Sequence, residues 1–243
     1  MKQVLITGAS SGIGAQLAID YASEGWQVIA CGQSEVRLAE LVKNNPLIMP
    51  LPFNVTNIVE VKQALESIEQ LPDLIILNAG TCEYIDNGVI DTALFKRVFD
   101  VNFFGLLHCI EAMQSRFSSS AHLVIIGSSA SFVPLPRAEA YGASKAAVAY
   151  LSHTLAIDLA HIGVTVTLVN PGFVKTPLTD KNDFQMPMLV TAEYASEQIR
   201  RGISAGKIEI NFPWKFNLLL KFIALLPLRL QLKAIKQFTG KRT

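Results

Sequence analysis

A tyrosine and a lysine lie four residues apart in the stretch Tyr141-Gly-Ala-Ser-Lys145, and Ser128 and Ser129 lie shortly before them. On a helix, this spacing places the phenol and the ammonium on one face, one turn apart. An ammonium beside a phenol favours the phenolate, so Lys145 should lower the pKa of Tyr141 below its usual value of about 10. The pair therefore suits a general acid and base that works near neutral pH.

A glycine-rich turn near the start of the chain predicts a phosphate site that such a pair could serve. The apolar run Val4 to Thr7 predicts a buried strand, and a helical pattern runs from about Ile13 to Ser23. Between them, Gly8 permits a tight turn, Gly12 lets the backbone approach a pyrophosphate, and Gly14 allows close packing of helix on strand. The helix N-terminus offers free N–H groups to phosphates. Because the Lys and Ser/Thr of a Walker P-loop are absent, the turn does not indicate an NTPase. The predicted cofactor contacts of this turn are Gly8, Ser10, Ser11, Gly12, Ile13 and Gly14.

The end of the second predicted strand, Gln27 to Cys31, bears on the choice of cofactor. NAD-binding proteins usually place an acid there to hold the ribose 2′-hydroxyl, but this chain has Gly32-Gln33-Ser34. The missing acid removes a repulsion against a 2′-phosphate, so the sequence favours NADP(H) over NAD(H). No Arg or Lys is adjacent and Arg37 lies one helical turn further, so NAD(H) stays open.

Six β/α alternations without a polar linker predict an α/β fold with a single doubly wound parallel sheet, Rossmann-like, over residues 1–210. Further strands are expected at 47–53, where Pro50 and Pro52 weaken the pattern, and at 73–77, 123–126 and 164–169. Helices are expected at 35–43, 55–68, 92–117 and 138–161. Ligand-like residues follow the strands at their carboxyl ends, where open sheets of this kind bind ligands. Beyond the first turn, they are Asn78, Gly80, Ser128 and Pro171. The further expected cofactor contacts are Asn54, Val55, Ala79, Gly172, Val174 and Thr176.

Composition narrows the class of protein. The chain has 243 residues, is 50% hydrophobic, and carries a net charge of +1, which points to no nucleic-acid partner. Cys31, Cys82 and Cys109 lack any metal-ligand or disulfide spacing and are expected to be buried thiols of a reducing cytoplasm. The four histidines show no ligand pattern either, so no metal is predicted. We see no secretory signal and no apolar stretch of 18 residues, and expect a cytoplasmic protein.

The C-terminal segment, residues 211–243, predicts a helical extension that is apolar and basic. Pro213 is placed to start a helix and Pro227 to stop it, and a second helical pattern covers 228–238. We favour a helix that covers the substrate pocket or packs in a subunit interface. A basic amphipathic anchor lying on anionic lipid stays open as the alternative.

The chain resembles the short-chain dehydrogenase/reductases over roughly residues 2–210, because six of their motifs occur in order. These are Thr7-Gly8-x-x-x-Gly12-Ile13-Gly14, Asn78-Ala79-Gly80, Asn102, Ser128, Tyr141-x-x-x-Lys145 and Pro171-Gly172-x-Val174-x-Thr176. The resemblance implies hydride transfer between a nicotinamide cofactor and a carbonyl or alcohol carbon of a hydrophobic small molecule, by a homodimer or homotetramer. It also implies a mobile substrate lid at 179–188.

The same resemblance implies a role for each catalytic residue. Tyr141 would donate a proton to the carbonyl oxygen, Lys145 would bind the nicotinamide ribose hydroxyls, and Asn102 would hold a water that passes protons through Lys145. Ser128 would bind the substrate oxygen, with Ser129 as its rival. Two positions depart from the family pattern: Asn54 replaces an acid, and Gln33 replaces the usual basic anchor of a 2′-phosphate. A dinucleotide-binding regulatory or scaffold protein without turnover is the alternative function.

Overall fold

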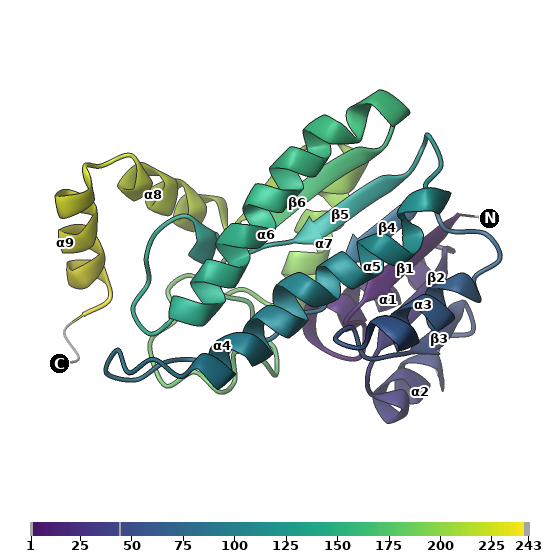
Figure 1. Ribbon diagram of the computed structural model, residues 1–243, viewed down its shortest axis with the longest axis horizontal. Helices are drawn as coiled ribbons and strands as arrows, with labels where there is room; N and C mark the ends of the chain where they lie inside the picture. Colours follow the sequence, from purple (N-terminus) through teal and green to yellow (C-terminus); the bar gives the residue numbers. More distant parts are fainter. Residues whose placement is uncertain (1, 44, 241–243) are drawn as a thin grey trace.

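Seven parallel strands form one sheet in the order β3-β2-β1-β4-β5-β6-β7, with helices on both faces (Figure 1). The structure is a computed structural model that describes residues 2–43 and 45–240. Its strands are β1 (Gln3–Thr7), β2 (Gln27–Gly32), β3 (Ile48–Pro52), β4 (Leu74–Leu77), β5 (His122–Ile126), β6 (Thr165–Pro171) and β7 (Glu209–Phe212). The predicted doubly wound parallel sheet is therefore confirmed.

The helices alternate with these strands and then continue beyond the sheet. They are α1 (Gly12–Ser23), α2 (Glu35–Lys43), α3 (Ile58–Glu66), α4 (Thr92–Phe99), α5 (Gly105–Met113), α6 (Glu139–Asp158), α7 (Ala192–Ser204), α8 (Trp214–Ala224) and α9 (Leu228–Phe238). A π-helical turn, Asp100–Phe104, joins α4 to α5, and short 3-10 helices cover Gln114–Arg116, Ser129–Ser131 and Ala160–Ile162.

Alternation of side chains along the strands divides the core into two layers. In β1, Val4 and Ile6 pack with buried residues of α1, α2 and α7, whereas Leu5 packs with those of α3, α5 and α6. All three of these β1 side chains are fully buried. This is the pattern of a parallel sheet covered on both faces, whose strands are apolar throughout. The carboxyl ends of the strands consequently lie at one edge, where their following loops meet.

Two features of the sheet go beyond the sequence prediction. A seventh strand, β7, pairs with β6, and helix α7 precedes it; neither was among the predicted elements. The domain boundary expected between residues 210 and 211 falls inside β7. The prolines of β3 are accommodated because β3 is an edge strand, where a missing N–H costs no ladder hydrogen bond on the open side.

The two C-terminal helices project from one end of the molecule (Figure 1). Pro213 lies directly before α8 and Pro227 lies between α8 and α9, as the sequence predicts. Within the described residues, no helix is long and apolar enough to cross a bilayer.

Candidate active site

Tyr141 and Lys145 lie one turn apart on the first part of α6, as their spacing predicts. Lys145 is buried, with 4% of its surface exposed, while Tyr141 is partly exposed. The Lys145 ammonium donates a hydrogen bond of 2.9 Å to the carbonyl oxygen of Ile126, the last residue of β5. Its nitrogen lies 6.0 Å from the centre of the Tyr141 ring. The ammonium is thus hydrogen-bonded to the carboxyl end of β5 and not to the phenol.

Ser128, and not Ser129, is the serine that meets the phenol. The Ser128 hydroxyl lies close enough to the Tyr141 phenol to lower its pKa, and its oxygen accepts from the Ala130 amide at 3.1 Å. These contacts arise because Ser128 caps the short helix that follows β5. Ser129 is buried inside that helix, with 4% of its surface exposed.

Burial sets the acidity of this pair. It raises the pKa of Tyr141 well above the usual value, and the nearby Cys82 adds to the rise, while the nearby Ser128 hydroxyl opposes it. Burial also lowers the pKa of Lys145 to about 8, although Cys82 opposes that shift. The expected lowering of the Tyr141 pKa by Lys145 is therefore wrong for this structure, because burial raises this pKa and Lys145 is not among the groups that shift it. Tyr141 remains a proton donor at neutral pH.

Asn102 lies in the π-helical turn between α4 and α5, and is buried. Its side-chain oxygen accepts from the Thr81 amide at 2.7 Å. Its side-chain nitrogen donates to the Thr81 carbonyl at 2.9 Å and to the Ser144 hydroxyl at 3.0 Å. Both amide hydrogens are thereby used within the protein. The side chain therefore ties the loop after β4 to α6 and does not offer these hydrogens to the expected water.

Thr7, at the end of β1, joins the first and fourth strands at their carboxyl ends. Its hydroxyl accepts from the backbone amides of Asn78 at 2.9 Å and Ala79 at 3.1 Å. The Asn78 side chain donates in return to the carbonyl oxygens of Thr7 and Gly8, at 3.0 and 3.3 Å. Thr7 was quoted in the motif but was not among the predicted site residues. Its fixed partners hold the glycine-rich turn against the predicted Asn78-Ala79-Gly80 segment.

The glycine-rich turn forms a cradle that side chains would fill. Gly8 and Gly12 have φ values of +67° and +56°, which favour glycine. A Cβ on Gly12 would lie 3.0 Å from the Thr176 methyl group. A Cβ on Gly14 would overlap the Gly8 carbonyl oxygen and would lie 2.5 Å from the Asn78 amide nitrogen. A backbone this closely packed at the start of α1 fits the pyrophosphate of a dinucleotide.

The residues expected near the adenosine half lie at the ends of β2 and β3. Gln33 is exposed directly after β2. Ser10 lies close to the end of β2, since a Cβ on Gly32 would be only 3.2 Å from the Ser10 side chain. Asn54 follows β3, and its side-chain oxygen accepts from the amide and hydroxyl of Thr56, both at 3.0 Å. This leaves the nitrogen of the Asn54 amide as its donor group. Val55 lines a cavity of about 10 Å³ together with Thr7 and Asn102.

The loop after β6 closes the cofactor side of the site. Pro171 ends β6, and the Gly172 amide donates to the Phe212 carbonyl at 2.7 Å. Val174 then forms a β-bridge with Val190. Thr176 lies over Gly12, where an added Cβ would be 3.0 Å from the Thr176 methyl group. The loop thus brings the predicted residues Pro171, Gly172, Val174 and Thr176 to the edge that carries the glycine-rich turn.

A cluster of three aromatic rings, which no sequence motif marks, starts near Tyr141. Tyr84 lies close enough for Tyr141 to influence its pKa, and its ring packs edge-on against Phe184 at 5.4 Å. Phe184 in turn packs against Phe173 at 6.0 Å. Cys82, expected to be buried, is only partly buried and lies beside Tyr141 and Lys145. These residues come from two loops, which carry no periodic pattern.

Phe184 lies within the segment expected to be a lid, 179–188, and packs against Phe173, which precedes that segment. The segment is irregular. Its residue Asp183 forms an ion pair of 2.6 Å with Arg137, which lies outside the segment. Its mobility stays a prediction. Among the described residues, no group of three or more His, Cys, Asp or Glu side chains is arranged to hold a metal ion.

The comparisons with known proteins agree with this geometry. The family model described as short chain dehydrogenase matches residues 2–186. The chain belongs to the short-chain dehydrogenase/reductase family. An uncharacterised oxidoreductase of Myxococcus xanthus is 32% identical over 238 residues, which cover 93% of each chain. A NADPH-dependent 1-acyldihydroxyacetone phosphate reductase of Schizosaccharomyces pombe is 34% identical over 74% of this chain and 62% of its own.

Solved structures share the fold of this family member. A short-chain dehydrogenase/reductase from Burkholderia phymatum in complex with NAD has a TM-score of 0.80 and 24% identity, covering 90% of this chain and 92% of that one. A polyketide ketoreductase of the actinorhodin system with NADPH has a TM-score of 0.76 and 22% identity, covering 87% and 95%. Since the family and these relatives agree, the protein is an NAD(P)-dependent dehydrogenase/reductase.

Proposed function

We propose that this dehydrogenase/reductase interconverts a carbonyl group and an alcohol on a hydrophobic small molecule, with Tyr141 as the general acid and base. One observation carries the proposal: the Tyr141 phenol lies beside the Ser128 hydroxyl, at the end of the sheet that also carries the glycine cradle. The bound nicotinamide cofactor supplies or accepts the hydride.

The side chains divide the remaining work. In reduction, Tyr141 donates its proton to the carbonyl oxygen, and Ser128 hydrogen-bonds the same oxygen as negative charge develops on it. In a buried site, such donors are already oriented toward the oxygen, so they stabilise the transition state by several kcal/mol. The buried Lys145 ammonium binds the cofactor's ribose hydroxyls and stabilises the phenolate left on Tyr141. Asn102 acts as a positioning residue, because it ties Thr81 to Ser144 on α6.

A preference for NADP(H) over NAD(H) is part of the proposal. The chain has Gln33 and Ser34 after β2 in place of an acid, so a 2′-phosphate meets no carboxylate there. Arg37, exposed on α2, is the nearest cation on that element. The NADPH dependence of the Schizosaccharomyces pombe relative agrees with this preference.

The aromatic cluster supports a hydrophobic substrate. Tyr84, whose pKa Tyr141 influences, packs against Phe184, and Phe184 packs against Phe173, so an aromatic cluster starts near the Tyr141 phenol. Each added methylene that such a wall removes from water favours binding by about 0.8 kcal/mol.

A panel of aldehydes and ketones of rising chain length tests the proposal. NADPH oxidation should be measured with each compound, and the alcohol product identified. We expect kcat/KM to rise about fourfold per added methylene until the wall is filled. If no compound in a broad panel is reduced, or if charged compounds are preferred, the proposed function is wrong.

A further inference from the structure

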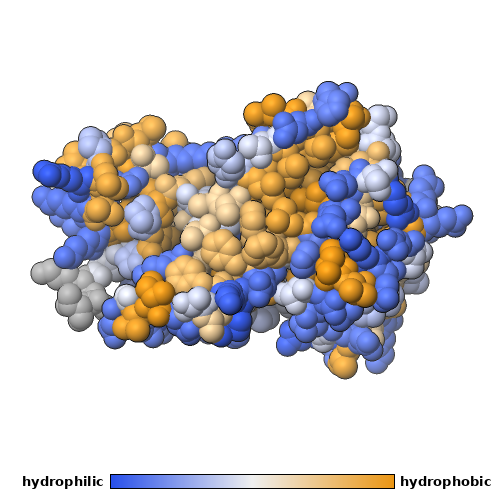
Figure 2. Space-filling model, in the orientation of Figure 1, coloured by the Kyte–Doolittle hydropathy of each residue, from blue (hydrophilic) through white to orange (hydrophobic). Residues whose placement is uncertain are grey.

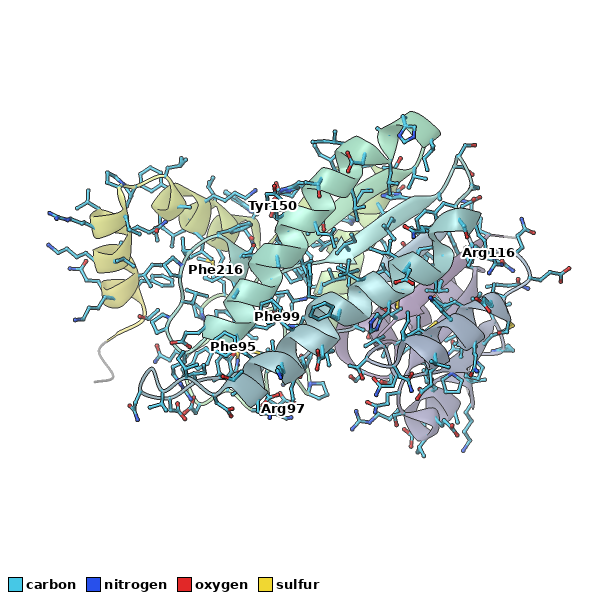
Figure 3. The ribbon with its side chains drawn as sticks, in the orientation of Figure 1. Phe95, Arg97, Phe99, Arg116, Tyr150 and Phe216 are labelled. Carbon is cyan, nitrogen blue, oxygen red and sulfur yellow. The ribbon has the colours of Figure 1, made fainter. Side chains whose placement is uncertain are left out.

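The C-terminal lobe, residues 213–238 with helices α8 and α9, is fixed to the body by one side only. Phe216, Leu220, Ile223 and Ile235 are buried together with Val133 of the loop after β5. Phe216, labelled in Figure 3, lies where the lobe joins the rest of the molecule. Because these residues anchor the lobe, they determine which side of the lobe faces away from the body.

The outward side of α8 is as apolar as its buried side. Its large side chains recur at intervals of four, four and three residues, so they lie on one face of the helix. The exposed fractions of this stripe are large: Trp214 62%, Leu218 60%, Phe222 63% and Leu225 84%. A helix that is apolar on both sides is normally covered on both sides. We therefore expect another apolar surface to cover this stripe.

Helix α9 places cations beside a second exposed apolar row. Leu228 and Leu232, spaced four residues apart, are 64% and 49% exposed. Arg229, Lys233 and Lys236 recur at four and three residues and form an exposed basic face on the same helix. Figure 2 shows both kinds of side chain on the lobe, with hydrophilic residues at its outer edge.

The charge of the chain is divided between the lobe and the body. No acid follows Glu209 in the sequence, and the seven Lys and Arg residues after it give +7, so residues 1–209 carry 14 − 20 = −6. Lys221 pairs with Glu209 at 2.8 Å. The other described cations of the lobe form no ion pair with any described residue; they are Lys215, Arg229, Lys233 and Lys236.

We propose that the C-terminal lobe docks on an anionic lipid surface. The apolar stripe would enter the boundary between headgroups and acyl chains, and the basic face of α9 would meet the anionic headgroups. Trp214, at the start of the stripe, is of the residue type that membrane interfaces favour. The negative body is repelled by the same surface, so the molecule approaches with the lobe first.

A second copy of the chain is the competing occupant of the stripe. Pairing two lobes through their outward faces would bring two uncompensated basic faces near each other, whereas anionic lipid neutralises them. Lipid therefore satisfies both the apolar stripe and the cations.

Co-sedimentation of the full chain with vesicles tests the proposal. Vesicles of phosphatidylcholine with phosphatidylserine should bind the protein at least about tenfold more tightly than vesicles of phosphatidylcholine alone. Raising NaCl to about 0.5 M should weaken this binding, since salt screens the headgroup charge. Failure to bind the anionic vesicles at low salt overturns the proposal.

A matched pair of charge variants distinguishes the effect of the lobe's cations on vesicle binding from the effect of net charge. The triple variant Arg229→Glu/Lys233→Glu/Lys236→Glu should lower vesicle affinity at least about tenfold. The control Lys43→Glu/Lys96→Glu/Lys207→Glu makes the same change in net charge on exposed body positions and should bind as the wild type does. An equal loss in both variants overturns the proposal, because net charge alone would then explain binding.

An apolar triple variant tests the stripe itself. Leu218→Ser/Phe222→Ser/Leu225→Ser should lose vesicle binding while its molar mass by light scattering and its circular dichroism stay those of the wild type. These residues are exposed, so the fold does not depend on them. A variant that keeps vesicle binding but falls to a smaller assembly shows that a second copy occupies the stripe, and this outcome overturns the proposal.

Discussion

The hydroxyl groups of Ser128 and Tyr141 lie beside each other, although they come from the end of β5 and from α6. Thirteen residues separate them in the sequence, and the contact forms because Ser128 caps the short helix between the two elements. A serine hydroxyl and a phenol that lie side by side can both reach a single substrate oxygen. This shared geometry underlies the proposed chemistry.

Replacement of Ser128 by Ala should lower kcat/KM for carbonyl reduction about 100-fold or more, because one donor to the developing oxyanion is lost. Ser129→Ala is the matched control, since Ser129 is buried in the next position and its removal should change kcat/KM less than about threefold. Steady-state kinetics of both variants measure this. Equal effects, or a larger effect at Ser129, would reassign the donor.

Gly14→Ala should weaken NADPH binding at least about tenfold and destabilise the fold by about 1 to 3 kcal/mol, because the added Cβ collides with the Gly8 carbonyl and the Asn78 side chain. Gly25→Ala serves as the control. Gly25 has a φ of +82° but has no atom within 4 Å of its would-be Cβ, so its cost is confined to backbone strain. Fluorescence titration with NADPH should show unchanged affinity for Gly25→Ala. Loss of affinity in both variants would point to global destabilisation instead.

Gln33→Asp should reverse the cofactor preference, because a carboxylate after β2 repels a 2′-phosphate and accepts hydrogen bonds from a ribose 2′-hydroxyl. We expect NADPH affinity to fall at least about tenfold relative to NADH affinity. Gln33→Asn, which keeps a neutral amide, should leave the ratio near that of the wild type. Parallel titrations with both cofactors measure the ratio, and an unchanged ratio in Gln33→Asp would place the 2′-phosphate site elsewhere.

Lys145 should give the fold a pH-dependent stability. Burial lowers the pKa of Lys145 to about 8 from the ordinary 10.5, so between these values the unfolded chain binds more protons than the folded one. The contribution of Lys145 therefore rises with pH in this window. Between about pH 7 and about pH 9.5, the wild type should gain up to about 2 kcal/mol relative to Lys145→Met.

Urea unfolding at both pH values measures that difference. The raised pKa of Tyr141 acts only above about pH 10, where the folded state keeps a proton that the unfolded state loses, so it does not affect this window. Lys96→Met, at an exposed position of α4, should follow the wild-type profile. Parallel profiles for the wild type and Lys145→Met would mean that Lys145 is not held in a desolvated site.

The sequence predicts those parts of the fold that local patterns determine. Helix α2 spans Glu35–Lys43, the predicted range, because its amphipathic period is uninterrupted. Strand β7 was missed because Glu209–Phe212 is short, and only its alternate residues are buried at the edge of the sheet. The π-helical turn at Asp100–Phe104 was hidden inside one long helical pattern, since a single wider turn hardly alters the period.

The candidate site was predictable where motif residues contact each other, and not where loops meet. The spacing of Tyr141 and Lys145 predicts their shared helix face. The raised pKa of Tyr141 comes instead from burial and from the nearby Cys82, both of which arise from tertiary packing. Tyr84 and Phe184 lie about 100 residues apart in irregular loops, so no periodicity could pair them.

The role of Tyr141 as the proton donor is the central claim, and the variant Tyr141→Phe tests it most directly. The variant keeps the ring and removes only the hydroxyl that meets Ser128. We predict that kcat for carbonyl reduction falls at least about 1,000-fold while the Kd for NADPH changes less than about threefold. A variant that retains more than about a tenth of the wild-type kcat would contradict the assignment of Tyr141 as general acid.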